Sequence, residues 1–287
     1  MSFSEKLRRA FGNLLAPRQT PVDKNEESAE MLLRKSQAAF NERNYEAAFL
    51  FLKNAAEMDN AMAQFILGLF YETGIGTKRN PVESEKWYRK SAEQDNFLGQ
   101  YHLGIFYYQG CVVGKDLAEA VKWFRKSADQ GYAEAQCELG LCYQNGEGVS
   151  QDKVMAVELF RKSADQGYAK AQCKLGLCYQ NGEGVGQDKV MAVDWFRKAA
   201  EQGYDKAQFY LANCCFNGTG VEQNFAEAVK WLRKAAEQGY VKAQCELGIC
   251  YMRGWGGQTG PRRSGKMAPQ SRGTGQSSCA MRARYLL

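Results

Sequence analysis

The residues best suited to chemistry are ten cysteines, and most of them recur at a fixed spacing. Three pairs have their members five residues apart: Cys137 and Cys142, Cys173 and Cys178, Cys245 and Cys250. On an α-helix, residues five apart point about 140° away from each other, so such a pair cannot face one metal ion. The equivalent places elsewhere hold aromatic residues, such as Phe65 and Phe70. We therefore expect no metal site and interpret these cysteines as reduced thiols that pack in a core.

A catalytic centre is not indicated by the remaining reactive residues. The only histidine is His102, at a position that we expect to point outward from its helix. No Ser-x-x-Lys motif precedes a credible base, and no pair of carboxylates recurs beyond charged helix faces. Because a nucleophile, a base and an orienting group are not all present, we predict a non-enzyme. We also expect no cofactor and no small-molecule substrate.

Glycine-rich loops and basic stretches both have structural interpretations. The Gly-Glu-Gly-Val loops at 146–149 and 182–185 lack the third glycine of a dinucleotide-binding motif and any following Gly-Lys-Ser or Gly-Lys-Thr. Basic stretches such as 122–126 fall in the last turns of helices, where cations complement the helix dipole. Residues 61–257 hold 23 basic and 23 acidic groups, so the net charge of +6 comes from the two ends. We expect no nucleic-acid partner.

The elements that carry these residues repeat with a fixed period. Residues 133–168 and 169–204 match at 29 of 36 positions without a gap. The same 36-residue frame defines five full repeats and a partial sixth: 61–96, 97–132, 133–168, 169–204, 205–240 and a remainder that begins at Val241. One such repeat cannot bury its apolar face alone, so neighbouring repeats must stack.

Each repeat has the pattern of two helices. The first is expected from about the third to the thirteenth residue of the repeat, and a glycine with positive φ ends it. These glycines are Gly74, Gly110, Gly146, Gly182 and Gly218. The second helix begins behind a side chain that can accept from the unpaired first amides. These caps are Asn80, Asp116, Asp152, Asp188 and Asn224.

The fold class that follows is all-α, a right-handed α/α solenoid of stacked antiparallel helix pairs in 36-residue repeats. We predict four segments: a basic amphipathic N-terminal segment with a linker at 1–27, a degenerate helix pair at 28–60, the repeat array at 61–257 and a disordered basic tail at 258–287. In the degenerate pair, Tyr45, Ala48, Leu52 and Ala55 have the spacing of a second helix. No apolar stretch approaches the roughly 20 residues that a membrane span needs.

The repeats resemble the Sel1-like repeat family, which is related to the tetratricopeptide repeats. The resemblance rests on A-x-A-Q-x-x-L-G-x-x-Y-x-x-G-x-G-V-x-x-D followed by A-V-x-W-F-R-K-A-A-E-Q-G, and it covers about 61–254. Two repeats depart from it. Gly110-Cys-Val-Val replaces G-x-G-V in one, and Ala212 and Cys215 replace the usual Gly and Tyr in the other. We expect these departures to loosen one loop and one packing contact.

This resemblance implies a non-enzymatic scaffold or adaptor that binds a protein or peptide on the concave face of the helical array. Secreted cysteine-rich members of the family usually bridge a first-helix cysteine to a second-helix one, and they have been linked to β-lactam binding and hydrolysis. The second helices here carry Ser127, Ala128, Ser163 and Ala164 instead. This favours reduced thiols and a cytoplasmic location. A secreted β-lactam-binding or hydrolysing protein and a passive structural spacer are the alternatives.

The N-terminal residues form a separate amphipathic pattern. Phe3, Leu7, Phe11 and Leu14 fall on one face of a helix over 2–15, with basic residues on or near the other face. Such a helix could rest on an anionic membrane, act as an organelle address, cap the exposed apolar end of the solenoid, or fray. We favour capping or fraying over membrane contact. Its apolar residues are interrupted by charges, so we predict no signal peptide.

The partner-binding surface is predicted on the first helices, which line the concave wall of tetratricopeptide-like arrays. Positions two, six and thirteen of each repeat point away from the apolar arc. We call the residues at these positions the stripe, and its first members are the apolar residues Met62, Ile66 and Leu98. We expect the stripe to bind a partner through the residues His102, Glu134, Glu138, Lys170, Lys174, Lys206, Tyr210, Lys242 and Glu246. Between the two near-identical repeats, the only charge reversals are Glu134 against Lys170 and Glu138 against Lys174. One interpretation is that the stripe binds an extended segment of mixed charge. The other is that these pairs only form salt bridges between adjacent repeats.

Overall fold

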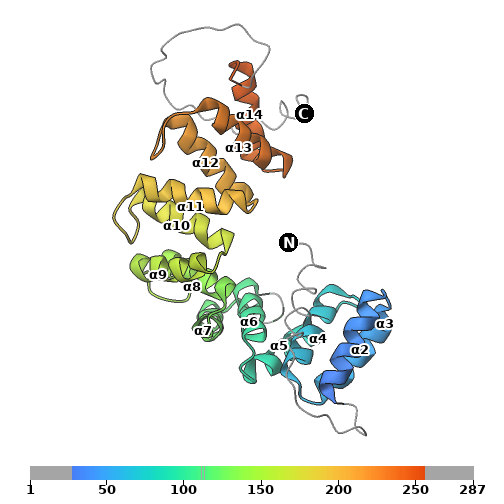
Figure 1. Cartoon of the computed structure of the whole chain (residues 1–287). Coiled ribbons are helices and arrows are strands. Elements are labelled where there is room, and N and C mark those ends of the chain that lie inside the picture. The colour runs from blue at the N-terminus through green and yellow to red at the C-terminus, as the bar shows by residue number, and fades with distance from the viewer. Residues whose placement is uncertain (1–27, 111, 113, 256–287) are drawn as a thin grey trace. The chain divides into compact units, whose positions relative to one another are not determined.

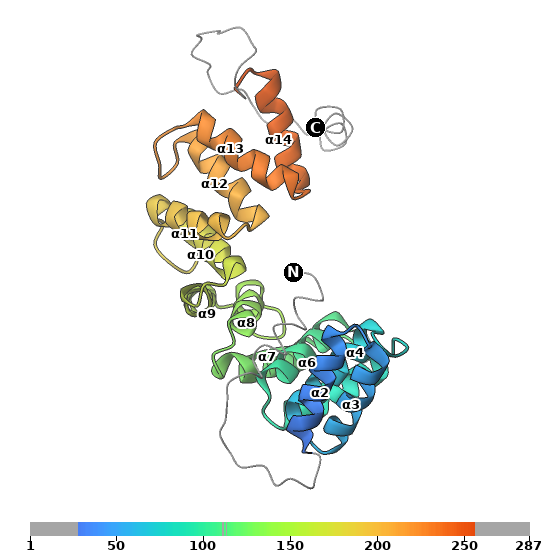
Figure 2. The ribbon, with the colours of Figure 1, turned by 45° about the vertical axis from the view of Figure 1, so that its right-hand side comes forward.

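The computed structural model describes residues 28–110, 112 and 114–255 of the chain. These residues form thirteen α-helices and no β-strand, and consecutive helices pack against each other in two compact units (Figures 1 and 2). The predicted all-α solenoid of helix pairs is therefore confirmed. The border between the units lies between Gln151 and Asp152.

The first unit contains seven helices: α2 (Ala29–Asn41), α3 (Tyr45–Glu57), α4 (Ala61–Thr73), α5 (Pro81–Glu93), α6 (Phe97–Gln109), α7 (Leu117–Asp129) and α8 (Ala133–Asn145). The described part of the second unit contains six: α9 (Lys153–Asp165), α10 (Ala169–Asn181), α11 (Lys189–Glu201), α12 (Asp205–Asn217), α13 (Phe225–Glu237) and α14 (Val241–Met252). We call α4, α6, α8, α10, α12 and α14 the first helices, and α5, α7, α9, α11 and α13 the second helices.

Local sequence signals explain where these helices begin and end. The side chain of Asp188 accepts hydrogen bonds from the amides of Val190 and Met191, and the other predicted caps act in the same way. The predicted glycines end the first helices with φ between 67° and 77°. The first helices start at the first residue of the repeat rather than the third, because the preceding Tyr or Asn already has an extended N-cap conformation.

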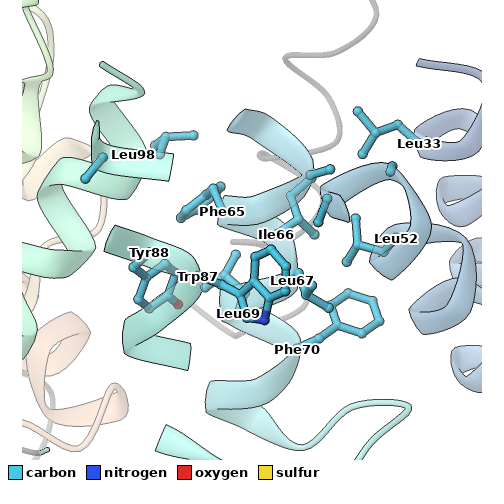
Figure 3. Packing of buried hydrophobic residues seen from close by; sticks show 14 of the residues in the cluster. Leu33, Leu52, Phe65, Ile66, Leu67, Leu69, Phe70, Trp87, Tyr88 and Leu98 are labelled. Carbon is cyan, nitrogen blue, oxygen red and sulfur yellow. The ribbon is translucent and has the colours of Figure 1, made fainter. Parts of the chain in front are cut away.

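Buried apolar residues from neighbouring helices interdigitate to form the core of each unit. In the first unit, Leu52 from α3, Phe70 from α4 and Tyr88 from α5 are fully buried (Figure 3). The helices α2 and α3 pack against each other, with Ala48, Leu52 and Ala55 of α3 buried and Tyr45 exposed.

Close packing between a first helix and its second helix depends on a glycine without a side chain. A Cβ on Gly68, Gly104 or Gly176 would lie 2.6–2.7 Å from the aromatic ring that follows it, Tyr88, Phe124 or Phe196. The departure at Ala212 coincides with Leu232 at the ring position of α13, and both residues are buried. In the fifth repeat, Ala212 is therefore larger than the glycine of the other first helices, and Leu232 is smaller than the aromatic residue that it replaces.

Several sequence predictions lie outside the described residues. These are the amphipathic helix at 2–15, the disordered tail at 258–287, and Cys111 and Val113 of the atypical loop. Val112 of that loop is half-buried and packs against the core of the first unit. None of the helices in the described part of the chain is long and apolar enough to cross a membrane.

Candidate interaction surface

The predicted stripe lies at the edge of the core rather than fully in solvent. Glu134 and Glu138 on α8 are half-buried, as are Lys170 and Lys174 on α10. Lys206 on α12 is exposed, and Lys242 and Glu246 on α14 are exposed as well. Position thirteen is exposed in every repeat. The charged part of the stripe therefore reaches solvent in both units.

The apolar start of the stripe was predicted wrongly. Ile66 is fully buried and Leu98 is nearly so. Both lie on helices that are apolar almost all round, so a helical wheel gave no reliable outward direction. These residues belong to the core of the first unit.

His102 was also placed wrongly, because its side chain is only 14% exposed. Its ring lies 5.1 Å from that of Tyr88 and 5.2 Å from that of Phe65, and its Nδ1 is 4.0 Å from a carboxylate oxygen of Glu72. The hydroxyl of Tyr88 donates to the same carboxylate at 2.6 Å. His102 is thus a packing residue in an aromatic cluster.

Tyr210 repeats this arrangement in the second unit. It occupies the same repeat position as His102, and its ring stacks on Phe196 of α11 with centroids 5.4 Å apart. Its other neighbour is Phe209, whose ring also contacts Tyr240. A ring at position six therefore covers the second helix of the preceding repeat.

Lysines from two first helices gather around one buried thiol in the second unit. Burial raises the pKa of Cys173 to about 12, and the positive charges of Lys174 and Lys206 oppose this rise. Tyr210 and Tyr240 lie in the same electrostatic neighbourhood, and Asp205 is the acidic group there. This surface of α10 and α12 is therefore predominantly basic and partly aromatic.

The cysteines of the first helices are packing residues, as predicted. Cys137, Cys142, Cys173, Cys178 and Cys250 are buried and Cys245 is half-buried; all eight cysteines of the described ranges are free thiols. Burial raises the pKa of Cys142 to about 12 and that of Cys178 to about 11. Such thiols stay protonated and react slowly. No group of three or more His, Cys, Asp or Glu residues suited to a metal ion occurs in the described structure.

The glycine-rich loops pack against protein, which leaves no cradle for a phosphate. A Cβ on Gly184 would overlap the carbonyl of Lys153, the first residue of α9, and Gly148 is placed in the same way against Leu117 of α7. The Nζ of Lys153 lies 3.9 Å from Glu183 of this loop. The loops therefore connect each repeat to the second helix before it.

Sequence reasoning missed an arginine–tyrosine contact between successive repeats. In four of the five second helices, an arginine donates to a tyrosine hydroxyl on the next first helix. These pairs are Arg89 to Tyr107 at 2.7 Å, Arg125 to Tyr143 at 2.9 Å, Arg161 to Tyr179 at 2.6 Å and Arg233 to Tyr251 at 3.1 Å. In the fifth repeat Cys215 replaces the tyrosine, and Arg197 bonds to Glu227 of α13 at 3.2 Å instead. These arginines do more than complement the helix dipole.

A set of glutamine hydrogen bonds between successive repeats was missed as well. The side chain of Gln202 donates to Gln172 at 2.8 Å, and Gln172 donates to the carbonyl of Ala164 in the preceding second helix at 3.2 Å. The glutamine of A-x-A-Q makes the latter bond in the other repeats too. The motif therefore satisfies a helix-terminal carbonyl across a repeat boundary.

Four second helices carry a lysine whose Nζ lies over the ring of the tryptophan three residues earlier. Nζ of Lys198 lies 4.1 Å from the ring of Trp195, and three other repeats have the same pair. A shallow hollow on α11 is lined by Met191, Asp194, Trp195, Arg197, Lys198 and Glu201. No nucleophile with an adjacent base lies in it, so we find no catalytic arrangement there.

Comparison with known proteins identifies the repeats. A model of the Sel1 repeat matches seven stretches of the chain: 42–60, 61–96, 98–132, 133–168, 169–204, 205–240 and 241–263. The structure is similar to that of a protective antigen present in uropathogenic Escherichia coli strains that displays an SLR fold, with 30% identity, a TM-score of 0.74 and coverage of 90% of this chain and 53% of the antigen. This chain thus spans about half the antigen's length. It is also similar to a Sel1 repeat protein from Oxalobacter formigenes, with 29% identity, a TM-score of 0.74 and coverage of 83% and 99% of the two chains.

Proposed function

The chain belongs to the Sel1 repeat family, and on this premise we propose that it is a non-enzymatic scaffold that binds a protein or peptide segment through its first helices. Sel1 repeats typically mediate protein–protein interactions. The proposed contact residues are the charged stripe residues that reach solvent, and each unit has its own set. These are Glu134 and Glu138 in the first unit, and Lys170, Lys174, Lys206, Lys242 and Glu246 in the second.

One observation carries this proposal. The two near-identical repeats differ in charge sign only at Glu134 against Lys170 and Glu138 against Lys174. The positions around them, such as Ala171, Cys173 and Leu175, are buried and unchanged between the two repeats. If the repeats 133–168 and 169–204 contact different parts of a partner, their surface charges should differ while their buried residues stay the same, as they do here. Salt bridges alone would contribute only about 0–1 kcal/mol each.

The chemistry of the described residues supports a binding role over a catalytic one. The buried thiols have raised pKa values, and His102 packs among rings beside Glu72. We also propose a cytoplasmic location, since protonated core thiols suit a reducing compartment.

The proposal is tested by comparing partner capture by three forms of the full chain. These are the wild type, the double variant Lys170→Glu/Lys174→Glu, and the control Lys162→Glu/Lys189→Glu. The control reverses the same number of charges on exposed lysines of the second helices α9 and α11. Proteins retained from a lysate are identified by mass spectrometry, and thermal unfolding of each form is recorded.

We expect the wild type and the control to retain the same protein and the stripe variant to lose it, while all three unfold at similar temperatures. Equal retention by the three forms would contradict the proposed surface. Retention of no protein by any form would favour a passive spacer. Loss that accompanies unfolding of the stripe variant would show only a structural role for these lysines.

A further inference from the structure

Helix α12 carries an amide side chain at a place where the other first helices carry an apolar one. Asn213 is the ninth residue of its repeat, and it is half-buried. The equivalents in the other repeats are Leu69, Ile105, Leu141, Leu177 and Ile249. Asparagine is a poorer helix former than leucine, and burying a polar group costs free energy unless it is hydrogen-bonded. Such a departure from the local pattern is expected where a residue serves a function.

The Asn213 amide has no hydrogen-bond partner within the described part of the chain, and neither does the hydroxyl of Tyr210 one turn earlier. Lys206, a further turn earlier, has no ion-pair partner among the same residues. Residues three and four apart lie on the same face of a helix, so these three side chains share one face of α12. This face therefore offers an ammonium, a hydroxyl and an amide group to a ligand.

The charges around this face are positive. Lys174 of α10 and Lys206 of α12 both lower the pKa of Cys173, so their ammonium groups lie near the same thiol. Positions two, six, nine and thirteen of α10 and α12 hold three lysines and no acidic residue. The acidic neighbour is Asp205, which already accepts from the backbone amide of Lys206 at 2.7 Å. The surface of these two helices is therefore complementary to an anionic ligand.

We propose that α10 and α12 bind an extended acidic segment of a partner protein, with its carboxylates at Lys174 and Lys206 and its backbone at the Asn213 amide. This inference rests on the proposed function and specifies the chemistry of the partner in the second unit. An asparagine amide both donates and accepts, so it matches the N–H and C=O groups of a peptide backbone. Those groups are unpaired only in a segment that is not helical. In an extended segment, alternate side chains point the same way, so acidic residues at every second place face the lysines together.

The test is the affinity of the full chain for a fluorescently labelled peptide that alternates Glu and Ser, measured by fluorescence anisotropy at low and high salt. The comparison probes are the same peptide with Gln in place of Glu, and a single-stranded DNA of the same charge. The variants are Asn213→Leu, which restores the residue type of the other repeats, and Lys174→Gln/Lys206→Gln. Lys162→Gln/Lys189→Gln is the matched control on exposed lysines of the second helices.

We expect the wild type and the control to bind the Glu peptide more tightly than the Gln peptide or the DNA. Asn213→Leu should weaken peptide binding by about two- to tenfold at both salt concentrations, because a lost hydrogen bond is not restored by screening. Lys174→Gln/Lys206→Gln should remove most of the binding at low salt and most of its salt dependence. Asn213→Asp is a second variant of unchanged size, and it should weaken binding further because its carboxylate repels the peptide. Thermal unfolding checks that each variant is folded.

Three results would overturn the proposal: no binding of the Glu peptide by the wild type, equal binding of the Gln peptide or the DNA, or equal binding by Asn213→Leu and the wild type. These failures are distinguishable from a failure of the proposed function. If a protein captured from a lysate is still lost on Lys170→Glu/Lys174→Glu, binding through the first helices stands, and only the acidic segment and the role of Asn213 are refuted.

Discussion

Replacing Gly176 with alanine tests how tightly each first helix packs against its second helix. An added Cβ would lie 2.7 Å from two ring carbons of Phe196 and 3.2 Å from the carbonyl oxygen of Ala192. Ordinary carbon contacts are about 3.5–4.0 Å. The ring must therefore retreat by about 1 Å within a core where Phe196 is fully buried.

Two opposing contributions set the size of the effect. Overpacking of this kind costs about 1–3 kcal/mol. Alanine in place of glycine inside a helix stabilises it by about 1 kcal/mol. Gly248→Ala in α14 is the matched control, because it gains the same helix propensity with no described atom near its Cβ. The free energies of unfolding of the two variants should differ by about 1–3 kcal/mol.

The assay is urea-induced unfolding followed by circular dichroism at low protein concentration. We expect the midpoint to fall or stay level for Gly176→Ala and to rise for Gly248→Ala. Adding Phe196→Leu to Gly176→Ala should restore part of the loss, because the fifth repeat combines Ala212 with Leu232. If both single variants shift the midpoint equally, or if the leucine adds a further independent loss, the packing argument is refuted.

Four further predictions follow from the contacts and burial of individual residues. Gly184→Ala, at a φ of +70°, should lower the free energy of unfolding in urea by about 2–5 kcal/mol, whereas Gly186→Ala in the same loop, which has open space around it, should change it by less than about 1 kcal/mol. Iodoacetamide at pH 8 should modify the half-buried Cys245 before the other described thiols, which are buried. The free energy of unfolding should fall as the pH rises from about 9 to about 12, because the buried thiols of Cys142 and Cys173 stay protonated in the folded state while the same thiols ionise in the unfolded chain. Tyr179→Phe, which removes the hydroxyl that accepts from Arg161, should cost about 0.5–1.5 kcal/mol in the same urea assay, and an unchanged midpoint would contradict this contact.

The fold was predictable because the same helix-capping and helix-ending residues recur in each repeat. A single Asp cap or a single glycine would be weak evidence, but Asp188 and Gly182 recur in register with their equivalents through five repeats. The sequence left the contacts between repeats undetermined, since they depend on how one helix pair rotates onto the next. The pairing of Arg161 with Tyr179 left no signal in the sequence, because Arg197 is still an arginine where Cys215 replaces the tyrosine, and there it bonds to Glu227.

The candidate surface was only partly predictable. A helical wheel identifies the side that faces the helix's own partner, but a first helix also packs against the second helix of the preceding repeat. That second neighbour partly buries His102 and Tyr210, which stack on Tyr88 and Phe196. The same neighbour explains why the charged residues at the stripe positions are mainly long side chains. Lys174, for example, is half-buried but can extend its charged end into solvent.

Lysine footprinting of the complex tests the scaffold account most directly. The full chain is acetylated with and without the captured partner, and modification of each lysine is measured by mass spectrometry. We predict that the partner protects Lys170, Lys174 and Lys206 on the first helices and leaves Lys162 and Lys189 on the second helices as reactive as before. Protection of the second-helix lysines alone, or equal reactivity of all five with and without the partner, would contradict binding through the first helices.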